Sequence, residues 1–125
     1  MIIEGIAVSG LGEGSYFMSM GHYRKEIKKK LKFDAYQGTL NLKVKKKDRD
    51  LLKKLGSIEI KGYKTKDKMF YGAKCYKARI QNISGAIIMP GLNKHGKDII
   101  EFIAPVHLKS KLKIKDGDRV TINII

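Results

Sequence analysis

The feature that most constrains the fold is a series of short runs that alternate apolar and polar residues between polar or glycine-containing turns. Such alternation is typical of β-strands with one buried face. The runs are IIEGIAV, GTLNLKV, SIEIKGY, MFYGAKCYKARIQ, ISGAIIMP, DIIEFIAP and RVTINII. Helical patterns do not alternate with them, which argues against a doubly wound parallel sheet. The sequence therefore predicts a mainly β fold, a small closed barrel decorated by short helices.

The expected helices are few. In GHYRKEIKKKLKF, three apolar residues recur every fourth position, which predicts a helix with a narrow buried stripe of Tyr23, Ile27 and Leu31. DRDLLKKLG predicts a second helix, with Asp48 as its N-terminal cap and Gly56 just past its end. VHLKSKLKI predicts one or two helical turns, and DGD predicts the turn before the last strand.

Length and composition limit the class of protein. The 125 residues are expected to form one domain, 1–125, with a single core. The one cysteine, Cys75, excludes an internal disulfide and is expected to be a half-buried strand residue rather than a nucleophile. Neither a signal peptide nor a membrane span is expected, because a basic leader and a long apolar run are both missing. We expect a soluble, cytoplasmic monomer that does not bind membranes.

The charge is strongly unbalanced. Twenty-seven basic and twelve acidic side chains leave a net charge of +15. This excess suits a polyanionic partner, whether nucleic acid, an anionic membrane or nucleotide phosphates. It equally suits a solvated surface in a cell that is hot or rich in potassium salts, so charge alone does not choose between these classes.

Three glycines at alternate positions, Gly10, Gly12 and Gly14, follow the first strand in SGLGEGSY. A flexible loop or a bulge is the commoner explanation of such a pattern in isolation. The functional explanation is a nest of backbone N–H groups around an anion, where a Cβ would block the approach. Ser15 would add a donor there, and Tyr16 would offer a ring or a hydroxyl group.

Thr39 and Asn41 stand two positions apart in GTLNLKV and are expected to share one face of the strand. Both carry neutral oxygen atoms, which are suitable ligands for Mg²⁺. Without a carboxylate, such a site would bind weakly until a nucleotide brought its phosphates. The alternative is the ordinary polar face of an edge strand.

Glu101 interrupts the otherwise apolar strand DIIEFIAP. A carboxylate in a barrel wall can accept a hydrogen bond from a substrate hydroxyl group or take its proton. An outward-facing, solvated glutamate is the alternative. His95 and His107 are expected to be loop or surface residues rather than general bases.

The segment GLNKHGKD, residues 91–98, matches most of the P-loop pattern G-x-x-x-x-G-K-[ST]. Asp98 stands where that pattern needs a hydroxyl group. A P-loop must also open a helix, whereas IIEFIAP is a β-branched run that ends in Pro105. The match is therefore a coincidence.

Five segments in this order, SGLGEGSY, YQGTLNL, GAIIMP, IIEFIAP and LKIKDGDRVTINI, resemble the archaeal CTP-dependent riboflavin kinase family. The resemblance runs along nearly the whole chain. It implies a six-stranded cradle-loop barrel, unrelated to P-loop kinases. It also implies a phosphotransferase that moves the γ-phosphoryl group of CTP to the terminal ribityl hydroxyl of riboflavin, giving FMN and CDP with Mg²⁺.

The resemblance also implies roles for individual residues. Two segments would hold the nucleotide, and they comprise Leu11, Gly12, Glu13, Gly14, Ser15 and Tyr16, then Val106, His107, Leu108 and Lys109. Thr39 and Asn41 would be the Mg²⁺ ligands. Asn93 and Glu101 would contact the flavin, with Glu101 as the general base. Gln37 departs from the family pattern, which often has a proline there, and Asn93 replaces the usual threonine.

A competing class is a basic nucleic-acid-binding barrel of the transcription-regulator kind. The lysine runs 28–30 and 45–47 would then follow a phosphate backbone. This class explains the charge better, but it does not explain a pair of metal-type oxygens in GTLN or the glycine loop. Riboflavin and CTP are therefore the expected partners, in preference to nucleic acid.

Overall fold

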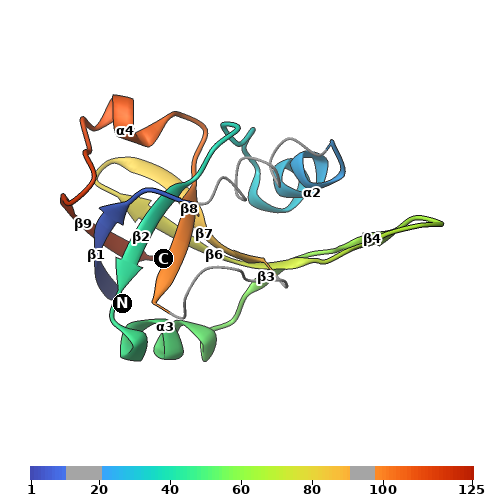
Figure 1. Ribbon diagram of the computed structural model, residues 1–125, viewed down its shortest axis with the longest axis horizontal. Helices are drawn as coiled ribbons and strands as arrows, with labels where there is room; N and C mark the ends of the chain where they lie inside the picture. Colours follow the sequence, from blue (N-terminus) through green and yellow to red (C-terminus); the bar gives the residue numbers. More distant parts are fainter. Residues whose placement is uncertain (11–20, 91–97) are drawn as a thin grey trace.

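Antiparallel strands close into a barrel in the computed structural model, which describes residues 1–10, 21–90 and 98–125 (Figure 1). Six strands of these ranges form the ring, in the order β6-β7-β8-β2-β1-β9, and β9 pairs back with β6. Their bounds are β1 (Ile2–Val8), β2 (Leu40–Val44), β6 (Ala73–Ile80), β7 (Ile83–Pro90), β8 (Ile99–Ile103) and β9 (Arg119–Ile124). The predicted closed barrel is confirmed. No helix in the described ranges is long and apolar enough to cross a membrane.

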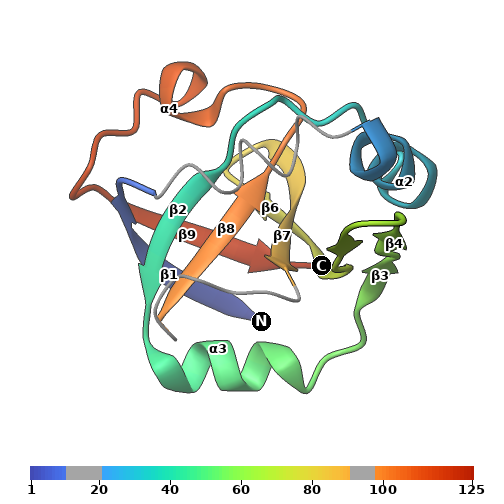
Figure 2. The same ribbon diagram turned by 45° about the vertical axis from the view of Figure 1, so that its right-hand side comes forward.

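The barrel interior is filled by alternate residues of its strands, as strand periodicity requires. Inward residues of β2 are Leu40, Leu42 and Val44, and β8 contributes Ile100 and Phe102. Two short helices close the barrel. Figure 2 shows α3 (Lys46–Lys53) and α4 (Leu108–Lys111) at opposite ends. The fully buried Leu52 of α3 and Leu108 of α4 join the same core.

A second core lies outside the barrel wall, beneath α2 (Gly21–Leu31). The buried residues of this helix are Tyr23, Ile27 and Leu31, which confirms the predicted stripe. They pack with residues of β6, β7 and β8, including Cys75, Ile88 and Ile103.

Cys75 is fully buried within this second core, rather than half-buried as expected. Burial raises the pKa of its thiol to about 12, because the thiolate would lose its hydration there. The thiol therefore stays protonated, as an inert core residue does.

The predicted cap of α3 is wrong. The helix begins at Lys46, two residues before Asp48, and its N-cap residue is the extended Lys45, which makes no side-chain capping hydrogen bond. The Asp48 N–H already donates to the Lys45 carbonyl at 3.0 Å. Asp48 therefore lies in the first turn, where its negative charge interacts favourably with the positive end of the helix dipole.

The long strand expected over residues 69–81 is also broken. Its start, β5 (Met69–Phe70), pairs with β4 (Tyr63–Lys64) in a hairpin that projects from the barrel (Figure 1). The break falls at Gly72, where a Cβ would lie 2.5 Å from the Ile60 carbonyl oxygen. The short β3 (Ile58–Ile60) pairs with β6 beyond that break.

Candidate functional site

Two polar residues face each other on the outer side of the barrel wall. Asn41 on β2 is paired in register with Glu101 on β8, and Glu101 is paired in turn with Ile88 on β7. Although they point away from the interior, Asn41 is only 8% exposed and Glu101 only 3%. The solvated alternatives for these two residues therefore do not hold. Buried polar side chains such as these require hydrogen-bond partners or ligands.

Thr39 comes just before β2 and contacts the carboxylate of Glu101. Its hydroxyl group donates a hydrogen bond to Glu101 Oε1 at 3.0 Å. A hydroxyl group has one proton and two lone pairs, so donation to Glu101 leaves the Thr39 oxygen able to accept. The same contact fixes the orientation of the Glu101 carboxylate.

The side-chain carbonyl oxygen of Asn41 is buried, and it accepts no hydrogen bond from the part of the chain that the structure describes. An unsatisfied buried acceptor costs about 1–3 kcal/mol. Such an atom is suited to bind a cation or a donor that arrives with a ligand. Sequence reasoning found the residue but not this burial.

Gly10, two residues after the end of β1, lies directly against this amide. A Cβ built on Gly10 would come 2.2 Å from Asn41 Nδ2 and 2.8 Å from Asn41 Oδ1. At least the first of the three glycines therefore allows a close approach between the backbone and a side chain. The whole of the predicted nucleotide loop, from Leu11 to Tyr16, lies outside the described residues.

The donor set fits a nucleotide-borne divalent ion better than a permanently held one. The described residues contain no group of three or more histidine, cysteine, aspartate or glutamate side chains able to hold a metal. Thr39 Oγ1 and Asn41 Oδ1 are neutral oxygens, and Mg²⁺ in proteins is commonly held by few side chains together with substrate phosphates. These two atoms could hold such an ion beside the Glu101 carboxylate.

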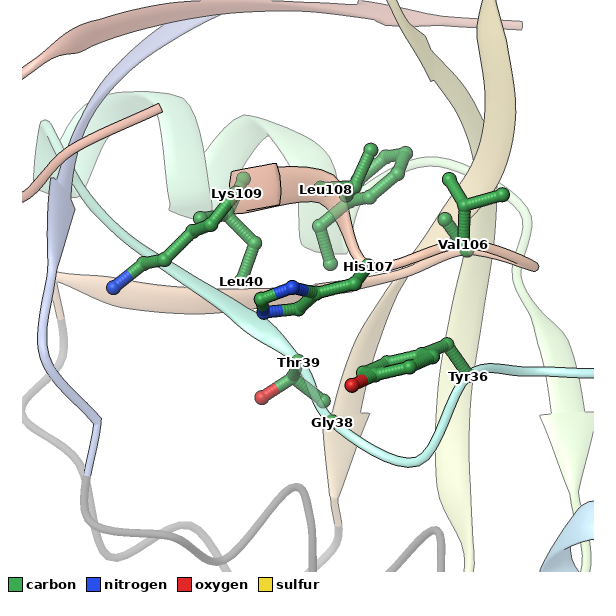
Figure 3. Close-up of a pocket in the computed structure, with 10 residues that line it drawn as sticks. Tyr36, Gly38, Thr39, Leu40, Val106, His107, Leu108 and Lys109 are labelled. Carbon is green, nitrogen blue, oxygen red and sulfur yellow. The ribbon is translucent and has the colours of Figure 1, made fainter. Parts of the chain in front are cut away.

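The second predicted nucleotide segment lines a pocket with Thr39. Figure 3 shows this pocket, to which Val106, His107, Leu108 and Lys109 all contribute. The exposed ring of Tyr36 lies beside that of His107, with centroids 5.0 Å apart and planes tilted by 31°. Tyr36 also lines this pocket, and its sequence position gave it no predicted role.

Asp116 connects this segment to the end of β1. Its carboxylate accepts a hydrogen bond from Ser9 Oγ and another from Lys109 Nζ at 2.7 Å. These contacts, that of Lys109 foremost, hold the pKa of Asp116 below its usual range. Sequence reasoning treated DGD only as a turn and missed this role.

The remaining expectations concern β8 (Ile99–Ile103) and the histidines on either side of it. Asn93 and His95 lie outside the described residues. The strand expected after the P-loop-like segment is confirmed, since β8 begins at Ile99. His107 is exposed, as predicted, and its Nδ1 is 2.6 Å from Ser110 Oγ.

Comparisons with known proteins point to one family. The model for the CTP-dependent riboflavin kinase domain, described as a domain of unknown function (DUF120), matches residues 7–124. A riboflavin kinase from Archaeoglobus fulgidus is 42% identical over 98% of this chain and 54% of its own length. One from Saccharolobus solfataricus is 42% identical over 98% of this chain and 73% of its own. The chain spans about half the length of several of these curated relatives.

Proposed function

The chain belongs to the CTP-dependent riboflavin kinase family, and from this we propose that it transfers the γ-phosphoryl group of CTP to riboflavin. The acceptor is the terminal ribityl hydroxyl group, and the products are FMN and CDP. The observation that carries the proposal is the buried pair of Asn41 and Glu101, together with the half-buried Thr39, beside Gly10. Oxygen atoms that can hold a metal ion, next to a buried carboxylate that can take a proton, suit phosphoryl transfer to a hydroxyl group.

CTP binds between the two predicted nucleotide segments. Leu11 to Tyr16 hold its phosphates through backbone donors, and Val106 to Lys109 contact the cytidine side. Two features support this placement. Gly10 leads from the Asn41 side chain directly into the first segment, and Thr39 lines the same pocket as the second.

Thr39 and Asn41 hold Mg²⁺ through their side-chain oxygens. When bound, the ion neutralises negative charge on the phosphate oxygens. The unsatisfied, buried Oδ1 atom of Asn41 supports this role, because ligation satisfies it. Since neither ligand is charged, the protein depends on the phosphates to bring the ion to the site.

Glu101 orients the ribityl hydroxyl group and takes its proton. The hydroxyl oxygen attacks the γ-phosphorus, the bond from that phosphorus to the bridging oxygen breaks, and CDP leaves. Thr39 holds the carboxylate by a 3.0 Å hydrogen bond, and burial of Glu101 keeps competing water away. Asn93 contacts the flavin in this proposal.

The surroundings fit this chemistry. The net charge of +15 draws anionic CTP toward the protein. The single domain acts in the cytoplasm, where the free Cys75 thiol is not required to pair.

The direct test mixes the protein, riboflavin and Mg²⁺ with CTP or ATP in separate reactions, and resolves the flavins by chromatography. FMN is expected with CTP and little or none with ATP. The absence of FMN with every nucleotide would exclude the proposal. Salt-sensitive binding of DNA or RNA without flavin turnover would favour the regulator-like barrel instead.

A further inference from the structure

We propose that Asp116 is a positioning residue that fixes the two nucleotide segments relative to each other. This inference rests on the function proposed above. One carboxylate contacts two distant parts of the chain. Ser9 Oγ donates to Asp116 Oδ2 at the entry of the glycine loop, and Lys109 Nζ donates to Asp116 Oδ1 from α4. Ser9 lies two residues before the first proposed nucleotide segment, and Lys109 belongs to the second.

The backbone around Asp116 is anchored to the strand that leads into the glycine loop. The Gly117 N–H donates to the Ala7 carbonyl at 2.7 Å, and the Ala7 N–H donates to the Asp118 carbonyl at 2.9 Å. Gly117 has a φ of +94°, a conformation that glycine adopts without strain. The Asp118 side chain closes the turn by accepting from the Lys115 N–H at 2.8 Å. Asp116 is therefore presented from a fixed turn that is hydrogen-bonded to Ala7, two residues before Ser9.

The contact with Asp116 fixes the position of the Lys109 ammonium group. Its side chain lines the pocket that Thr39 shares, and a lysine carries its charge on a flexible four-carbon stem. The 2.7 Å ion pair with Asp116 is partly shielded, since the two side chains are 35% and 49% exposed. Without Asp116, the ammonium group would lose its fixed place, and CTP binding would have to order it.

Removal of Asp116 has two opposing effects. It takes a negative charge away from the neighbourhood of the phosphates, which would strengthen nucleotide binding. It also releases Ser9 and Lys109, which would weaken binding. The two hydrogen bonds to the charged carboxylate are direct contacts, so their loss is the larger effect and we expect net weakening of CDP binding.

The experiment measures Kd for CDP with Mg²⁺ in the absence of flavin, together with kcat and KM for CTP. Asp116→Ala is expected to raise Kd and KM about tenfold, while kcat changes less than about threefold. Asp116→Asn, which retains an acceptor oxygen, should fall between this variant and the unmodified protein. Asp50→Ala is the charge-matched control, because Asp50 is exposed on α3 at the opposite end of the barrel.

A double-mutant cycle tests whether Asp116 affects CDP binding through Lys109. With Lys109→Met already present, Asp116→Ala should weaken CDP binding by less than about threefold, because the partner it positions is gone. Unchanged or tighter CDP binding in Asp116→Ala overturns the inference, as does a full tenfold loss in the Lys109→Met background. Normal CDP binding without FMN formation would refute the proposed function and leave the role of Asp116 testable by Kd alone.

Discussion

Gly10 lies against the side chain of Asn41 so closely that a Cβ on Gly10 would sit 2.2 Å from the amide nitrogen. Real Cβ contacts are not that short, so the amide and a side chain at position 10 cannot both keep their places. The contact joins the start of the glycine loop to the proposed metal ligand. Displacement of either one therefore disturbs the other.

Gly10→Ala should displace the Asn41 side chain and weaken binding of Mg²⁺-CDP by about tenfold or more. Titration of CDP with and without Mg²⁺ checks this. Gly56→Ala is the matched control, because a Cβ there meets nothing within 4 Å and should leave binding unchanged. Equal CDP affinity in the unmodified and Gly10→Ala proteins would show that the contact between Gly10 and Asn41 does not contribute to nucleotide binding.

Asn41→Ala should lower kcat/KM by about 100-fold or more, because one of the two proposed protein ligands of the ion is lost. The fold should persist, since the deleted Oδ1 atom is unsatisfied among the described residues. Turnover measured over a range of Mg²⁺ concentrations, with thermal unfolding alongside, tests both statements. Asn123→Ala on β9 is the control, an exposed strand asparagine whose removal should change neither. Unaltered Mg²⁺ dependence in Asn41→Ala would contradict the ligand assignment.

Glu101→Gln keeps the shape of the side chain and removes the proposed base. We expect kcat to fall about 100-fold or more while Kd for CDP stays within about twofold, since general bases typically contribute 10²–10⁴-fold. Glu59→Gln, an exposed glutamate on β3, provides the control. Full turnover in Glu101→Gln would remove the general-base role.

The pKa of Asp116 is lowered chiefly by the hydrogen bond from Lys109, and next by that from Ser9. Lys109→Met should therefore raise the pKa of Asp116 toward its usual range, measured from the carboxyl carbon shift by NMR. A carboxylate with a depressed pKa stabilises the fold above its unfolded-state pKa, and loses that effect as the pH falls through the folded-state value. The contacts to Ser9 and Lys109 should thus weaken only in acid. An unchanged pKa in Lys109→Met would mean that the pair does not form in solution.

Periodicity was sufficient to predict the elements that bury a regular face. Leu40, Leu42 and Val44 alternate into the barrel interior, and Tyr23 and Ile27 lie on the buried side of α2. These elements follow from local residue spacing, which packing then reinforces.

What could not be predicted depends on contacts between distant segments. Asn41 and Glu101 are buried on the outer face of the wall, and no spacing within one strand reveals that these outward-facing residues are buried. Their pairing depends on the register between β2 and β8. The link from Asp116 to Ser9 joins residues 107 positions apart. The start of α3 at Lys46 could not be predicted either, because its N-cap residue, Lys45, makes no side-chain capping hydrogen bond.

The most direct test of the central claim is a crystal structure of the protein with CDP and Mg²⁺. We predict the ion at about 2.1 Å from both Thr39 Oγ1 and Asn41 Oδ1, with phosphate oxygens completing its coordination. An ion and phosphates bound away from these two side chains would contradict the account.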